Sequence, residues 1–169
     1  MKKLLLIAIV LLAACRDDTA ENRPDPVAIT AESTAFFCQM NLVEMKGPKA
    51  QIHLEGYEEP LFFARVMDGI AYLKNPEKMA PITAFYVSDM SLAPSWDAPG
   101  PDNWMLADDA FYVVGSDIRG GMDAPEFAPF STQAAAQAFQ ASHGGDILRL
   151  ADIPLDMVLG ENTIDAQGS

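Results

Sequence analysis

The chain has 169 residues, half of them apolar and a fifth charged, so it can bury a core and is not disordered by composition. Its 24 acidic residues outnumber its 11 basic residues and give a formal charge of −13. Such a surface repels the phosphates of nucleic acids, so a nucleic-acid-binding protein is excluded. The charge favours a cationic partner or ion, although solubility alone also accounts for it.

Residues 1–14 predict a signal peptide. A basic "MKK" precedes the apolar run "LLLIAIVLLAA", which is too short to cross a bilayer as a helix. The following "LAAC" resembles the bacterial lipobox, so we expect Cys15 to be lipidated and to become the mature N-terminus. Loss of Lys2 and Lys3 with this peptide leaves nine basic and 24 acidic residues, a formal charge of −15.

Two stretches rich in helix- and strand-breaking residues divide the mature chain. Residues 15–34 are polar, with two prolines and no periodicity, and predict a lipid-anchored tether. Residues 91–103 hold three prolines and a glycine and predict a linker. We therefore expect a first module over residues 35–90, a second over 104–153 and a tail over 154–169.

In the first module, the alternating "AQIHL" (50–54) and the short apolar "PLFFA" (60–64) predict strands. "RVMDGIAYL" (65–73) places apolar residues at i, i+4 and i+7, as in a helix, and "ITAFYV" (82–87) is typical of a strand. The first module is therefore expected to run strand, strand, helix, strand.

The second module repeats this order. "AFYVVG" (110–115), "EFAPF" (126–130) and "DILRLADI" (146–153) predict strands. The segment 131–145 predicts a helix that begins at a Ser or Thr N-cap and ends at Gly-Gly. The expected fold is thus α+β, with two related ββαβ modules that arose by duplication.

The segment "AFFCQMNLV" (35–43) is apolar and aromatic enough to predict a further strand. In a strand, Cys38 and Met40 would share one face with their Cα atoms about 6.6 Å apart. A thiolate and a thioether on one face suit a soft ion such as Cu(I). Cys38 is also the single thiol left after lipidation of Cys15, and in an oxidising compartment such a thiol is either buried or used. The alternative that Cys38 and Met40 are ordinary core residues stays open.

Other site classes lack a signature in this sequence. It contains no G-x-S-x-G, phosphate-binding glycine loop, HExxH or CxxC. His53 lies in a predicted strand, and His143 lies at the end of a predicted helix, where it either favours the helix dipole or ligates a metal. Met45 stands directly before "KGP" (46–48), a predicted turn, so its side chain is not placed relative to Cys38.

Several motifs together resemble the NosL family. They are the lipobox and the segments "FCQMNLVEMKGPKAQIHL" (37–54), "FYVSDM" (85–90), "AFYVVGSDIRGGMDAPEFAPF" (110–130) and "FQASHGGDILRL" (139–150). The resemblance covers nearly the whole mature chain after the tether. It implies two ββαβ modules similar to the organomercurial lyase core, and a lipoprotein that binds one Cu(I).

The resemblance also implies a function without catalysis. Such a chaperone would face the periplasm from its membrane anchor and deliver copper to nitrous oxide reductase, with a membrane ABC-type complex as docking partner. The family's Cys-x-Met falls on Cys38 and Met40, with Gln39 where relatives often have Gly, and its Asp-Met motif falls on Met90. Met122 and His143 are secondary candidates. The alternatives are a structural lipoprotein without metal and a thiol enzyme that cleaves organometallic compounds; the latter is disfavoured because only one free cysteine remains.

Overall fold

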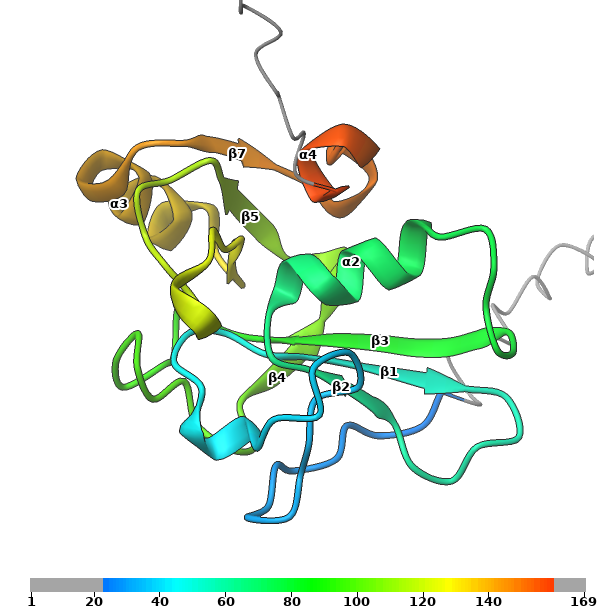
Figure 1. Cartoon of the computed structure of the whole chain (residues 1–169). Helices are drawn as coiled ribbons and strands as arrows, with labels where there is room; N and C mark the ends of the chain where they lie inside the picture. The colour runs from blue at the N-terminus through cyan, green and yellow to red at the C-terminus, as the bar shows by residue number, and fades with distance from the viewer. Residues whose placement is uncertain (1–22, 160–169) are drawn as a thin grey trace, which may run out of the picture.

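The computed structural model describes residues 23–159, which form two antiparallel sheets flanked by helices (Figure 1). The expected signal peptide and Cys15 lie outside the described residues. Within residues 23–159, no helix is long and apolar enough to cross a membrane.

The first sheet has four strands in the order β2-β1-β3-β4. Their bounds are Ala50–Leu54 for β1, Leu61–Phe63 for β2, Ile82–Ser88 for β3 and Trp104–Leu106 for β4. Helix α2 (Val66–Lys74) covers one face of this sheet (Figure 1). Gly69 permits this close approach, because a Cβ there would lie 2.8 Å from Cβ of Ala50 and 3.2 Å from the Phe85 ring.

The second sheet has three strands in the order β6-β5-β7. Their bounds are Phe111–Val114 for β5, Ala128–Phe130 for β6 and Asp146–Leu148 for β7. Helix α3 (Gln133–His143) packs on this sheet; it begins at Thr132, whose side chain accepts from Ala135 N, and ends at Gly144 with a positive φ. The remaining short helices are η1 (Leu42–Glu44), η2 (Ala107–Asp109), η3 (Gly121–Asp123), η4 (Leu150–Asp152) and α4 (Leu155–Leu159).

The expected α+β class is confirmed. Each sheet contains a strand, strand, helix, strand series in which the first strand is central, giving β2-β1-β3 in one half and β6-β5-β7 in the other. The two halves therefore share a topology, while their origin by duplication stays a prediction.

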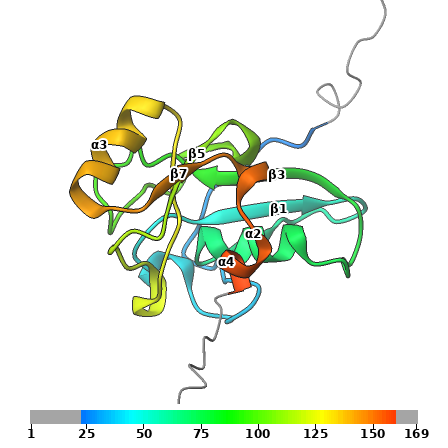
Figure 2. The same cartoon turned by 90° about the horizontal axis from the view of Figure 1, so that it is seen from above.

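One apolar core joins the two halves. Ile52, Ile70 and Phe85 of the first sheet and α2 pack in the same cluster as Tyr112 and Ile153 of the second half. Seen from above, α4 sits over α2 (Figure 2), on which it packs. The halves are thus packed as one body and are not separate domains on a linker.

Four local expectations are corrected by the structure. Residues 35–43 form a turn and η1 in place of a strand, because Gln39 adopts a left-handed φ of 57° that reverses the chain. Residues 104–106, assigned to the second module and not predicted as a strand, form β4 and pair with β3 of the first sheet. After Leu148 the predicted last strand becomes η4, and residues 155–159 of the expected tail form α4, which packs on α2 through Val158.

The predicted tether is also partly ordered on the sheet. Residues 23–34 run along the face of the first sheet opposite α2, drawn in blue in Figure 1. We call residues 23–34 the strap. With α2 on one face and the strap on the other, all five residues of β1 are buried.

Candidate metal centre

Cys38 lies in a closed loop formed by residues 34–41. An isolated bridge between Thr34 and Asn41 closes the loop at its base. Within the loop, Ala35 N donates to Met40 O at 2.9 Å, and Gln39 N donates to Ala35 O at 2.8 Å. These bonds fix the backbone that carries the thiol.

Gln39 stabilises the turn between the two sulfur residues. Its side-chain amide donates to the carbonyl oxygens of Ala35, at 3.3 Å, and Phe36, at 2.8 Å. Its φ of 57° is a conformation that glycine adopts most readily. The glycine expected at this position in family members is thus explained by backbone geometry.

The Cys38 side chain is partly buried against apolar residues. It packs against a cluster of Ala35, Leu42, Phe62 and Ala64, and Met45 packs against the same cluster. In contrast, Met40 is 39% exposed and its neighbour Phe37 is 54% exposed. The structure therefore brings Cys38 and Met45 into one cluster and leaves Met40 at the surface of the loop. The strand geometry predicted for Cys38 and Met40 does not occur.

Met90 packs in a different apolar cluster, at the junction of the two sheets. Its backbone N donates to Pro129 O at 2.9 Å, and its side chain lines a shallow pocket with Trp96, Phe130 and Phe139. The rings of Trp96 and Phe139 stack with centroids 5.8 Å apart. The thioether of Met90 therefore lies among aromatic side chains.

The backbones of three loops, around Gly47, Trp96 and Gly120, meet in a junction between these two clusters. Gly47 N donates to Trp96 O at 3.0 Å, and a Cβ on Gly47 would lie 3.2 Å from Gly120 Cα. A Cβ on Gly121 would lie 3.5 Å from Sδ of Met45. The next residue, Met122, is 51% exposed and has a φ of 59°. The loops that carry Met45, Met90 and Met122 thus converge here.

The two histidines have hydrogen-bond partners of their own, Gln51 for His53 and Asp117 for His143. His53 is buried on the outer face of the first sheet, and its Nε2 lies 3.0 Å from Gln51 Oε1. Burial lowers the pKa of His53. His143 ends α3, and its Nδ1 lies 2.9 Å from a carboxylate oxygen of Asp117. The His143 ring packs on Phe139 with centroids 4.5 Å apart.

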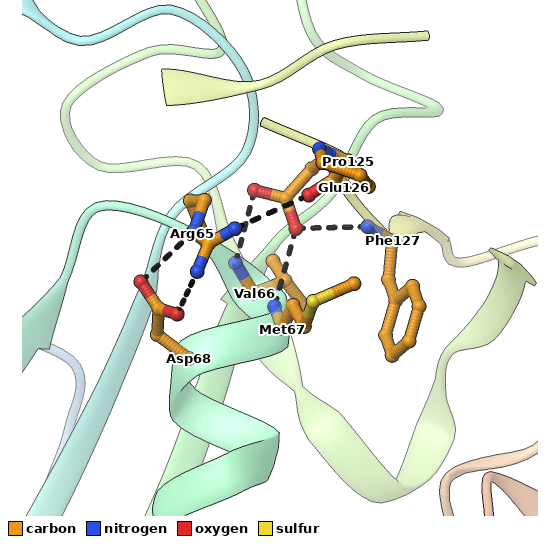
Figure 3. A network of polar contacts seen from close by, with 7 residues as sticks. All are labelled: Arg65, Val66, Met67, Asp68, Pro125, Glu126 and Phe127. Atoms are coloured by element: carbon orange, nitrogen blue, oxygen red, sulfur yellow. Dashed lines mark hydrogen bonds and ion pairs between the residues drawn. The ribbon is translucent and has the colours of Figure 1, made fainter. Parts of the chain in front are cut away.

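A buried polar network supports the first turn of α2 (Figure 3). The fully buried carboxyl group of Glu126 accepts from Val66 N at 3.2 Å, from Met67 N at 3.1 Å and from its neighbour Phe127 N at 2.8 Å. It satisfies helix N–H groups that the preceding Arg65 does not cap with its side chain. Burial, opposed by these hydrogen bonds, raises the pKa of Glu126 to about 8.

Arg65 joins this network to Cys38. Its Nε donates to Asp68 at 3.0 Å, and its guanidinium reaches the Pro125 carbonyl (Figure 3). Burial lowers the pKa of Arg65, but the hydrogen bond and charge of Asp68, followed by the charges of Glu126 and Cys38, raise it overall. Arg65 therefore links the polar network at the start of α2 to the neighbourhood of Cys38.

Lys49 organises the turn that follows Met45. The side chain is 2% exposed, and its ammonium donates to the carbonyl oxygens of Met45 at 2.8 Å, Lys46 at 3.3 Å and Gly47. Burial lowers its pKa to about 8, against a raising effect of Glu126. Sequence reasoning missed Lys49, Arg65 and Glu126. Each carries a charge in an apolar stretch, which is a signal of a buried polar network.

The donor types at this junction are mainly sulfur. Among residues 23–159, no group of three or more His, Cys, Asp and Glu side chains is placed to hold a metal ion. The sulfur donors do not meet at one point: Cys38 and Met45 pack against one apolar cluster, Met90 packs in another, and Met40 and Met122 are exposed. A thiol and thioethers suit a soft monovalent ion better than Zn²⁺, Mg²⁺ or Ca²⁺.

Fold and site together define a small α+β domain of two similar sheets, with a free thiol and several methionines on the loops near their junction. The chain belongs to the NosL family, whose model matches residues 26–158. This confirms the family resemblance inferred from the motifs.

Relatives support this assignment at the level of sequence. The chain is 53% identical over 157 residues to "Copper-binding lipoprotein NosL" of Achromobacter cycloclastes, an alignment that covers 92% of this chain and 81% of that protein. It is 27% identical over 150 residues to the protein of the same name from Stutzerimonas stutzeri, covering 88% and 76% of the two chains.

Solved structures agree. The crystal structure of the copper chaperone NosL from Shewanella denitrificans matches with a TM-score of 0.72 at 31% identity, covering 76% of this chain and 95% of that one. The solution structure of apo-NosL from Achromobacter cycloclastes matches with a TM-score of 0.50 at 54% identity, covering 71% and 94%.

Proposed function

We propose that this protein is a lipid-anchored metallochaperone that binds Cu(I) and delivers it to nitrous oxide reductase during assembly of the copper centres. The observation that carries the proposal is the partly buried Cys38 in a hydrogen-bonded loop, in a chain whose relatives are named copper-binding proteins. Cys38, Met40 and Met90 are the proposed sulfur ligands, and Met45, Met122, His53 and His143 are further candidates.

The proposed chemistry is ligand exchange. Thiolate and thioether ligands select Cu(I). Met40 is 39% exposed, so an incoming sulfur or imidazole of an acceptor can reach the ion before the thiolate leaves. Copper is cargo in this scheme, and no bond of a substrate is broken.

The partners and location follow from the same proposal. Lipidation of Cys15 would hold the domain at a membrane surface on the periplasmic side, next to a membrane ABC-type maturation complex. The acidic surface, with a formal charge of −13 for the whole chain, favours docking to a basic face of the acceptor. A Cys15→Ser variant that still fractionates with membranes would contradict the anchor.

Two other functions compete with copper transfer. A structural lipoprotein would use Cys38 only as a packed core residue. A thiol enzyme for carbon–metal bond cleavage needs more than one working cysteine, and the sequence offers Cys38 alone once Cys15 is lipidated. Anaerobic titration with Cu(I) against a competing chelator separates both from the chaperone.

We expect one Cu(I) per chain, with affinity lowered at least tenfold, or about 1.4 kcal/mol, by Cys38→Ser and by Met40→Ala. Met90→Ala tests the third ligand, and Met79→Ala, at a 51% exposed methionine outside both sulfur clusters, is the matched control. X-ray absorption of the loaded protein then counts sulfur against nitrogen neighbours. No stoichiometric binding by the parent chain would rule out the chaperone, whereas unchanged affinity of the Cys38 and Met40 variants would rule out only this ligand set.

A further inference from the structure

Two polar side chains are buried on the outer face of the first sheet. Gln51 is fully buried in β1, and His53, two residues on, is 5% exposed. A buried amide costs free energy unless its donor and acceptor are both paired. Both groups of Gln51 are paired, and their shared partner is the backbone of the strap.

The Gln51 side chain pairs with the backbone of Val27 through one accepted and one donated hydrogen bond, as neighbouring strands pair in a sheet. Val27 N donates to Gln51 Oε1 at 2.8 Å, and Gln51 Nε2 donates to Val27 O at 2.9 Å. His53 Nε2 lies 3.0 Å from Gln51 Oε1 and orients this amide. Nearby, the Tyr86 hydroxyl donates to Pro24 O at 2.7 Å. Gln51 thus holds the strap on the sheet by hydrogen bonds, and Tyr86 provides a second attachment.

The strap continues from Val27 into the Cys38 loop. Ile29 N donates to Pro101 O at 2.8 Å, and Val27 and Ile29 pack against the same apolar cluster as Cys38. Farther on, the Asn41 side chain donates to Ala31 O.

The end of the strap is also one side of the base of the loop. Thr34 bridges Asn41, and Leu42 N donates to Ser33 O at 2.9 Å. A displacement of the strap therefore removes packing from the apolar cluster that Cys38 contacts and removes one side of the base of the loop that carries Met40.

We propose that Gln51 is a positioning residue for the Cys38 loop and acts through the strap. Its role in copper handling rests on the proposed function; its role in ordering the loop does not. Arg23 follows the predicted anchor, Cys15, by eight residues, so the segment that orders the loop is also the one that leads toward the anchor.

The test uses the full chain with Gln51→Met, which keeps the length of the side chain and loses both bonds to Val27. We expect the amides of Ala35, Gln39 and Leu42 to exchange hydrogen about tenfold faster, and Cys38 to be alkylated faster by a similar factor. Gln51→Glu retains the acceptor for Val27 N and serves if Gln51→Met does not fold.

Two further variants make the result specific. Ile29→Asp disrupts the packing of the strap without changing the sheet and is expected to reproduce the effect of Gln51→Met. Gln140→Met is the matched control, since it removes a side-chain bond of 2.8 Å to Gly145 O beside α3. It is expected to leave the Cys38 loop unchanged.

The proposal is overturned if Val27 exchanges faster while the loop amides and Cys38 keep parental rates. It is also overturned if amides of β5 and α3 accelerate by the same factor as the loop, because the effect is then general destabilisation. Copper titration of the same variants is a separate readout. If the parent chain binds no Cu(I), the proposed function is wrong, but the hydrogen-exchange result still tests the role of Gln51 in ordering the loop.

Discussion

Gln39 decides the geometry of the proposed ligand loop more than the sulfur residues beside it. The apolar and aromatic character of residues 35–43 is shared by strands and by packed loops, so composition could not tell them apart. The loop forms because Gln39 adopts a left-handed backbone conformation, with a φ of 57°, and its side chain donates hydrogen bonds to Ala35 O and Phe36 O. Such a conformation is rare for a residue with a Cβ, and a single sequence gives no direct signal for it.

Gln39→Val is expected to destabilise the protein, because a β-branched side chain tolerates positive φ poorly and Val cannot make the two bonds. The matched control is Gln39→Gly, which also loses both bonds but accepts the conformation. We expect the free energy of unfolding in urea to be about 1–2 kcal/mol lower for Gln39→Val than for Gln39→Gly. Equal values for the two variants would show that the left-handed backbone is not maintained in solution.

At the scale of elements, α2 was predicted from its apolar spacing, and the structure places it at Val66–Lys74 as expected. Its N-terminal cap could not be predicted, because the capping carboxyl group comes from Glu126, 60 positions away from Val66. Local patterns report which residues face a core, whereas contacts between distant segments depend on how the elements pack. Met45 is a second case, because its neighbour Gly121 belongs to the other half of the chain.

The Glu126 cap predicts a pH dependence. Burial raises the pKa of Glu126 from 4.5 to about 8 in the folded protein, so the native state keeps a proton that the unfolded chain loses between these values. Its contribution to the free energy of unfolding therefore falls as pH rises from about 4.5 to 8, by at most about 1.4 kcal/mol per pH unit.

Glu126→Gln removes this titration and keeps one amide oxygen as an acceptor. We expect the unfolding free energy of the variant, relative to the parent, to rise steadily between pH 5 and 8 in urea titrations. A difference between the two proteins that does not change with pH would contradict a raised pKa at Glu126.

For the whole molecule, the sequence predicts two modules but no strand at residues 104–106, where the structure has β4. Strand β4 has three residues, too few for a periodicity, and it joins the first sheet from beyond the proline-rich segment. The core then crosses that segment, since Tyr112 and Ile153 pack in one cluster with Phe85 and Ile70. Two modules that share a core are expected to fold as one cooperative unit.

The two tryptophans allow a test of this cooperativity. Trp104 lies in β4 and packs with Phe62 of the first sheet, while Trp96 stacks on Phe139 of α3 in the second half. Trp96→Phe leaves a reporter of the first half, and Trp104→Phe leaves a reporter of the second. In each variant we expect the fluorescence transition in urea to coincide with the far-UV circular dichroism transition, because loss of either half exposes the shared core. Fluorescence of one reporter that changes at a lower urea concentration than the circular dichroism signal would mean that its half unfolds first, and that the common core does not couple the two sheets.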